Sequence, residues 1–179
     1  MNFTSRILIV PGLGNSGEDH WQSIWEEQWP DFVRVNQQDW ETPLCLDWIE
    51  QLDEAVMAGD PSEVILVAHS LACTTVAYWA KVFQRSIKGA LLVAPSDTEA
   101  PTYPSGTTGF SPVPLRQLPF PSIVVASTND HYVTLERATL FARAWGSELV
   151  VLEKAGHINV GAGYGHWPEG LKLLQELDS

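Results

Sequence analysis

The sequence has few cysteines, few basic residues and no long apolar run. Its two cysteines, Cys45 and Cys73, cannot form a disulfide framework, and neither belongs to a C-x-x-C pair. Ten Lys and Arg stand against 22 Asp and Glu, giving a net charge of −12. No basic stripe is present to neutralise phosphates, so we expect neither a nucleic-acid partner nor binding to an anionic membrane surface. Free cysteines favour a reducing compartment, most simply the cytoplasm.

Several sequence signals are also absent. The first apolar run, Ile7 to Val10, is too short for the core of a signal peptide, and no segment approaches the length of a membrane span. No H-E-x-x-H motif or cluster of His, Cys and Asp suggests a metal, and we expect no cofactor. There is no internal repeat and no linker, so the 179 residues are interpreted as one domain, 1–179.

Apolar strand patterns alternate with helical patterns along the whole chain. Short apolar runs predict strands at 6–10, 32–35, 64–67, 87–94, 122–127 and 148–152. Helical periodicity predicts helices at 21–29, 44–58, 71–82, 135–145 and 167–177. This order is typical of a three-layer α/β/α sandwich with a six-stranded, mostly parallel sheet.

The stretch from Glu63 to Cys73 carries the strongest motif. A buried strand runs straight into Ala68-His69-Ser70-Leu71-Ala72, and a helix follows. Strand, tight turn and helix around a serine are the context of a nucleophile elbow, usually written G-x-S-x-G. Alanine replaces both glycines here, and it is small enough for the strand and helix to pack at the bend. The alternative is that Ser70 only caps the helix.

A glycine-rich loop follows the first strand. Gly12-Leu13-Gly14-Asn15-Ser16-Gly17 matches G-x-G-x-x-G, the dinucleotide-binding fingerprint. Against that interpretation, Glu18 and Asp19 begin the next helical segment, where a pyrophosphate needs positive potential. The other interpretation is a loop whose backbone amides face an oxyanion.

Two further segments bear on a binding pocket. Trp21, Trp25 and Trp29 recur on one face of a helix, a spacing that is more typical of a core than of a binding platform. The segment Pro95–Pro121 holds seven of the twelve prolines and little periodicity. An ordered loop of this length often forms a lid or a binding wall, although a surface excursion without a role is the alternative.

Three residues suited to nucleophilic catalysis each follow a predicted strand. Ser70, Asp130 and His157 occur in the order that α/β-hydrolases use. A serine hydroxyl is a weak acid, so an imidazole must accept its proton, and a carboxylate must orient that imidazole. The carboxyl ends of parallel strands share one edge of the sheet, so the three side chains are expected to meet there.

Other residues compete for these roles. Asp97 also follows a strand and is an alternative acid, and His166 is a reserve base without a strand before it. We expect His131 to line the pocket rather than act on the serine, and His69 to point toward the sheet edge.

The sequence resembles the small single-domain α/β-hydrolases of the retinoblastoma-binding-protein-nine type. The matching motifs are Val10-Pro11-Gly12 with Gly14-Asn15-Ser16, His20-Trp21, Ala68-His69-Ser70-Leu71, Asn129-Asp130 and Gly156-His157-Ile158-Asn159. The resemblance implies a six-stranded parallel sheet, without the two leading strands of larger hydrolases, and a Ser70–Asp130–His157 triad. The small size of the chain leaves no room for a large cap domain, so we expect an α/β-hydrolase fold without one. The L-x-C-x-E pocket-binding motif is missing, because Leu71-Ala72-Cys73-Thr74-Thr75 lacks the glutamate. Binding to a retinoblastoma-type partner is therefore not expected.

These observations predict a metal-free, carboxylesterase-like serine hydrolase that acts on a small ester, thioester or amide. The backbone amides of Leu13 and Leu71 are expected to form the oxyanion hole. The expected substrate pocket comprises Gly12, Gly14, Asn15, Trp21, His69 and Tyr132. A non-catalytic binding module on a hydrolase fold is the alternative, and a nucleotide-binding protein is the third reading.

Overall fold

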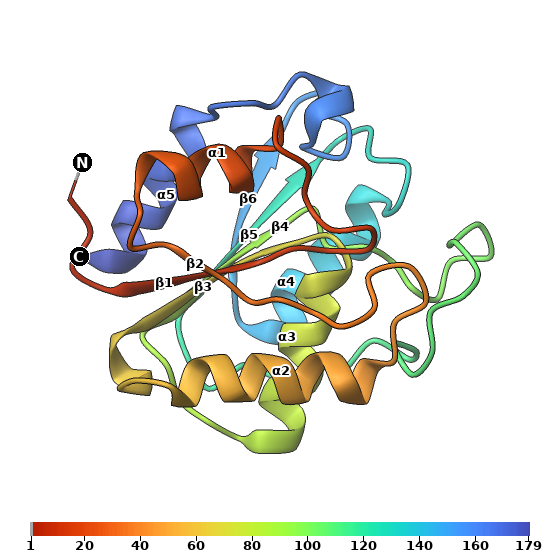
Figure 1. Ribbon diagram of the computed structural model, residues 1–179. Helices are drawn as coiled ribbons and strands as arrows, with labels where there is room; N and C mark the ends of the chain where they lie inside the picture. Colours follow the sequence, from red (N-terminus) through yellow and green to blue (C-terminus); the bar gives the residue numbers. More distant parts are fainter. Residues whose placement is uncertain (1) are drawn as a thin grey trace.

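A computed structural model describes residues 2–179 and contains one six-stranded sheet (Figure 1). The strands are β1 (Arg6–Val10), β2 (Val33–Arg34), β3 (Val64–His69), β4 (Gly89–Val93), β5 (Ser122–Ser127) and β6 (Glu148–Leu152). Their order across the sheet is β2-β1-β3-β4-β5-β6, and all five pairings are parallel. The α/β fold class is confirmed, with a fully parallel sheet in the part of the chain described.

Helices cover both faces of the sheet. They are α1 (Trp21–Gln28), α2 (Cys45–Met57), α3 (Leu71–Phe83), α4 (Leu135–Trp145) and α5 (Pro168–Asp178). Two short 3₁₀ turns, η1 (Pro61–Glu63) and η2 (Val160–Ala162), complete the elements. In Figure 1, α1 and α5 lie on one face, while α2, α3 and α4 lie on the other. The result is the predicted three-layer sandwich.

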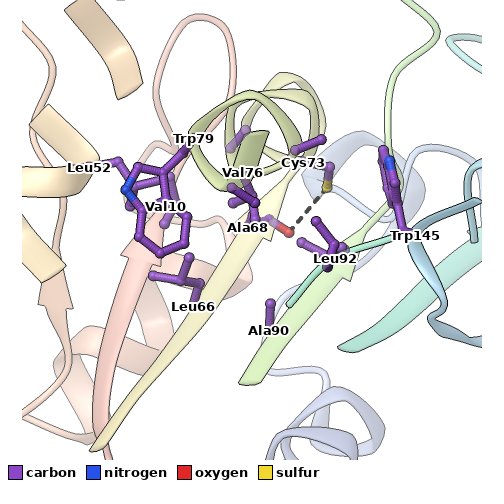
Figure 2. Close-up of a cluster of buried hydrophobic side chains, with 14 of the residues drawn as sticks. Val10, Leu52, Leu66, Ala68, Cys73, Val76, Trp79, Ala90, Leu92 and Trp145 are labelled. Carbon is purple, nitrogen blue, oxygen red and sulfur yellow. Dashed lines mark hydrogen bonds between the residues drawn. The ribbon is translucent and has the colours of Figure 1, made fainter. Parts of the chain in front are cut away.

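Alternation along each strand divides the core into two layers. Successive strand side chains point to opposite faces, so Leu66 and Ala68 join the layer under α2, α3 and α4 while Ile65 and Val67 join the other. Figure 2 shows the first layer, where Val76 and Trp79 of α3 lie against strand residues. The second layer holds Trp21 and Trp25 of α1 and Leu171 and Leu174 of α5. Because both faces are covered, the central strands are buried throughout and mostly apolar.

The sheet edge is where the structure differs most from the sequence pattern. Strand β2 has two residues instead of the predicted four, because it pairs with β1 alone at the edge. Trp29 caps the end of α1 instead of extending its buried face, and its ring stacks on Phe32 outside the regular elements. Trp21 and Trp25 are fully buried, as the spacing predicted.

The segment 95–121 contains no helix or strand but is packed against the body of the protein. Phe110, Val113, Leu118 and Phe120 are buried in the layer under α2, α3 and α4. This anchoring leaves Tyr103 and Pro104 beside the carboxyl ends of the strands. In the part of the chain that the structure describes, no helix is long and apolar enough to cross a bilayer.

Candidate active site

Ser70 occupies the sharp turn between β3 and α3. Its backbone angles are φ 59° and ψ −122°, a region that non-glycine residues rarely adopt. Strain of this kind costs on the order of 1–3 kcal/mol and persists where surrounding packing holds it. Ala68 and Ala72 are fully buried on either side of the turn. The two alanines therefore satisfy the demand for small side chains that the motif usually meets with glycine.

The turn also depends on Gly12, in the loop after β1. A Cβ placed on Gly12 would lie 2.7 Å from the backbone oxygen of His69 and 3.0 Å from Cβ of Ser70. Both neighbours belong to the elbow, so the glycine allows the loop to approach the nucleophile's backbone.

Replacing Gly12 with alanine should therefore displace the elbow. We expect a loss of about 1–3 kcal/mol in the free energy of unfolding, as for other overpacked sites, together with lower activity. Gly17→Ala is the matched control, because a Cβ there meets nothing within 4 Å. Chemical unfolding of both variants measures the difference, and equal stabilities would show that the close approach is not required.

Ser70, His157 and Asp130 form a continuous chain of hydrogen bonds. Ser70 Oγ lies 2.9 Å from His157 Nε2. His157 Nδ1 lies 2.8 Å from Oδ2 and 3.0 Å from Oδ1 of Asp130, whose side chain is fully buried. The amide of Tyr132 donates to Oδ1 of Asp130 at 2.8 Å and fixes the carboxylate.

Polar contacts between neighbouring loops hold His157 in place. Oδ1 of Asn129 accepts from the amide of Gly156 at 2.8 Å, which ties the loop after β5 to the loop after β6. The indole of Trp21 donates to the backbone oxygen of Ile158 at 2.9 Å. Nε2 of His69 contacts the backbone oxygen of His157 at 2.9 Å, and as a hydrogen bond this makes the imidazole the donor.

The competing residues lie elsewhere. Both carboxylate oxygens of Asp97 accept from the guanidinium of Arg137, at 2.9 and 3.0 Å. His166 is exposed, and its Nδ1 lies 2.9 Å from Gln28 Nε2. His131 is exposed and does not line the cavity beside Ser70, contrary to the expectation. Asp130 and His157 therefore form the hydrogen-bonded chain that ends at Ser70. Asp97, His166 and His131 take no part in it.

The glycine-rich loop is fixed by internal hydrogen bonds. The amide of Gly14 donates to Trp40 and the amide of Ser16 donates to Oδ1 of Asn15, both at 2.8 Å. Arg34 donates to Oδ1 of Asn15 at 2.9 Å, and the buried Gln22 accepts from the hydroxyl of Ser16 at 2.6 Å. Because the amides of Gly14 and Ser16 already donate to protein acceptors, they are not free to bind a pyrophosphate. This disfavours the interpretation of the motif as a dinucleotide-binding fingerprint.

A cavity of about 200 Å³ opens beside Ser70. Four of the six predicted pocket residues are present in its wall: Gly12, Asn15, His69 and Tyr132. Leu13, which was predicted to contribute to the oxyanion hole, also lines it. Gly14 and Trp21, which were also predicted, do not line it. Gly14 turns toward Trp40, and Trp21 is fully buried behind the wall, where it supports the His157 loop.

The wall also contains Ser96, Tyr103 and Pro104 of the segment 95–121, which was expected to form a lid or a binding wall. The sequence did not identify His20 and Asn159 as pocket residues. His20 and Asn159 stood in the motifs of the family resemblance, and Ser96 directly follows the strand that was used to nominate Asp97. Position after a strand end was the available signal for Ser96.

Two buried histidines beside His157 are held neutral. Desolvation, with contributions from Arg34 and His157, lowers the pKa of His20 to about 4. Burial, followed by the influence of His157 and His20, lowers the pKa of His69 well below its usual value. The rings of His20 and His69 lie 4.9 Å apart, as do those of His69 and His157. A neutral His69 keeps the ring hydrogen that it donates to His157.

The lowered pKa of His20 predicts acid lability. The unfolded chain binds a proton near pH 6.5 that the folded chain accepts only near pH 4, so stability falls as the pH drops through this window. His20 should contribute roughly 3 kcal/mol to that loss. His20→Asn, which keeps a capping side chain at the start of α1, should show a correspondingly smaller loss. Urea unfolding from pH 7 to pH 4 tests this, and parallel curves for the two proteins would contradict it.

Comparison with known proteins shows the family to which the chain belongs. The sequence model of the serine hydrolase family matches residues 7–176. The chain belongs to the serine hydrolase family. No curated protein sequence matches significantly. Among residues 2–179, no group of three or more His, Cys, Asp or Glu is arranged to hold a metal ion.

Solved structures with the same fold include a hydrolase and an esterase. A YdeN-like hydrolase from Pectobacterium atrosepticum is 33% identical, covering 96% of this chain and 89% of its own, with a TM-score of 0.84. The ydeN gene product of Bacillus subtilis is 19% identical over 97% of this chain and 98% of its own, with a TM-score of 0.82. Thermogutta terrifontis esterase 2, solved in one structure with butyrate bound, is 19% identical over 98% of this chain and 82% of its own, with a TM-score of 0.67. These likenesses confirm a small serine hydrolase with the α/β-hydrolase fold.

Proposed function

We propose that this serine hydrolase cleaves a small ester, thioester or amide through an acyl-enzyme formed on Ser70. The observation that carries the proposal is the hydrogen-bonded chain from Ser70 Oγ through His157 to the buried carboxylate of Asp130. Each atom has the partner that nucleophilic catalysis requires, and the nucleophile sits on a strained turn beside the cavity.

The proton follows this chain in both halves of the reaction. His157 Nε2 removes the hydroxyl proton as Ser70 Oγ attacks the carbonyl carbon, and it then gives that proton to the leaving group. Water next attacks the acyl carbon, with His157 accepting its proton and returning it to Ser70 Oγ. Asp130 keeps the ring hydrogen on Nδ1 and stabilises the imidazolium.

The oxyanion is proposed to be bound by the backbone amides of Leu13 and Leu71. Leu13 lies in the wall of the cavity. Leu71 is the first residue of α3, and its nitrogen would lie only 3.3 Å from a Cβ on Gly12, so the two loops meet beside the nucleophile. The start of a helix carries partial positive charge, which favours the developing negative oxygen.

The cavity supports a short acyl group. At about 200 Å³ it is smaller than typical pockets for drug-sized ligands, which start at ~300 Å³. Tyr103 and Tyr132 form part of its wall and narrow the space beside Ser70 that an acyl chain can occupy. The fold relative from Thermogutta terrifontis has been solved with butyrate and with propionate, which is consistent with an acyl group of this size.

A panel of p-nitrophenyl acetate, butyrate and octanoate, together with a matched thioester and amide, tests the proposal. We expect kcat/KM to be highest for the acetate or butyrate and to fall for the octanoate. If the folded protein hydrolysed none of the panel, the result would favour the alternative of a binding module on a hydrolase fold.

A further inference from the structure

A second serine hydroxyl lies against the proposed nucleophile. Ser96 Oγ is 2.7 Å from Ser70 Oγ. Ser96 follows β4 at the carboxyl edge of the sheet, and only 1% of it is exposed. It lines the same cavity as Ser70. The proposed mechanism above assigns it no role.

The hydrogen positions along the chain decide which hydroxyl donates. His157 Nδ1 faces the carboxylate of Asp130, so that nitrogen carries the ring hydrogen and Nε2 is the acceptor. The single hydrogen of the Ser70 hydroxyl is therefore directed to His157 Nε2. The contact between the two serines can then form only if Ser96 donates to Ser70 Oγ.

We propose that Ser96 is a further catalytic residue, whose hydroxyl donates to Ser70 Oγ and stabilises the negative charge that develops there. The inference rests on the proposed function. When His157 removes the proton from Ser70, Oγ gains negative charge and the hydrogen bond from Ser96 becomes charge-assisted. When the acyl-enzyme breaks down, the acyl–Oγ bond breaks and Oγ takes the electron pair, so the same donor assists its departure. A bond that strengthens as charge develops lowers the barrier more than it stabilises the ground state.

The surroundings of Ser96 hold its hydroxyl at the site. The backbone turns sharply just before it, with Ala94 at φ 49°. On the cavity side lies Tyr103, whose phenol stays protonated because burial raises its pKa to about 12, against a smaller lowering effect of the Ser96 hydroxyl.

The test compares Ser96→Ala with a matched control. Ser122 Oγ and Ser147 Oγ form a contact of the same 2.7 Å length at the opposite end of β5. Ser122→Ala therefore measures what the loss of a partly buried serine pair does to stability alone. For wild type and both variants, we would measure thermal midpoints, kcat and KM for an activated ester, and the rate of phosphonylation by a fluorophosphonate.

We expect Ser96→Ala to lower kcat and the phosphonylation rate by about 10- to 100-fold, the range for losing a hydrogen bond to a charged group, with KM nearly unchanged. Ser122→Ala should keep wild-type rates, and Ser96→Thr should recover most of the activity because it retains the hydroxyl. If Ser96→Ala does not fold, Ser96→Cys replaces it, because a thiol is a weak donor of similar shape.

Rates of Ser96→Ala within about threefold of wild type, below the loss expected for such a bond, would overturn the proposal. The same holds for an increase in KM without a change in kcat. Failure of the wild-type protein to react with the fluorophosphonate would instead overturn the proposed function, so the two failures are distinguishable.

Discussion

Replacing Asp130 with asparagine should lower kcat by about 10⁴-fold while leaving the fold intact. The carboxylate faces His157 Nδ1 at 2.8 Å and is fully buried. An asparagine in its place can present its amide group to the ring, which favours the tautomer with hydrogen on Nε2. That tautomer cannot accept the proton of Ser70. Steady-state kinetics with a short-chain ester, at a substrate concentration above KM, measures the effect.

Asp97→Asn is the control for that variant. Asp97 is the other acid that follows a strand end, but its carboxylate is engaged by Arg137. We expect kcat to remain close to the wild-type value and the thermal midpoint to fall, because an ion pair that is partly shielded from solvent is lost. A large loss of kcat in Asp97→Asn together with a small loss in Asp130→Asn would exchange the roles of the two acids.

Replacing Ser70 or His157 with alanine should have the largest effect of all, a loss of about 10⁴- to 10⁶-fold in kcat. The two residues act on the same proton, so removing both should cost little more than removing either one. The double variant is therefore informative beyond the single ones. Kinetics on highly purified Ser70→Ala, His157→Ala and the double variant, all confirmed as folded, test this dependence.

If the kcat losses of the two single variants multiplied in the double variant, that result would contradict a step shared by Ser70 and His157. Retained hydrolysis in Ser70→Ala would point to a nucleophile other than Ser70. Gly17→Ala serves as the folded control, because a Cβ at Gly17 meets nothing within 4 Å. It is carried through the same purification.

The sheet could be predicted from the sequence because buried parallel strands leave a simple pattern. Runs such as Val64 to Val67 are apolar on both faces, and the structure places them in the middle of the sheet. The edge strand was less predictable. Val33 and Arg34 are exposed and half-buried, so periodicity did not mark where pairing stops. The length of the edge strand β2 is set by its contacts with β1 and the loop after β1, which are remote from it in sequence.

The site was predictable where chemistry requires a particular residue type after a strand. Ser70, Asp130 and His157 were nominated on that basis, and the structure brings their side chains into hydrogen-bonding distance. Side-chain direction was not available from the sequence. Trp21 supports the His157 loop from behind, and Gly14 turns away toward Trp40.

Ser96 shows a different limit of sequence interpretation. A serine after a strand is common, and its significance arises from a 2.7 Å contact with a residue 26 positions earlier. His20 is similar, since its lowered pKa comes from burial and from Arg34 and His157. Such features depend on three-dimensional packing, and no local pattern records them.

Labelling with a fluorescent fluorophosphonate tests the central claim most directly. The account predicts that the folded wild-type protein is labelled stoichiometrically on Ser70, as located by peptide mass spectrometry, and that Ser70→Ala and His157→Ala are not labelled. A folded wild-type protein that stays unlabelled, or a label that persists in Ser70→Ala, would contradict the assignment of Ser70 as an activated nucleophile.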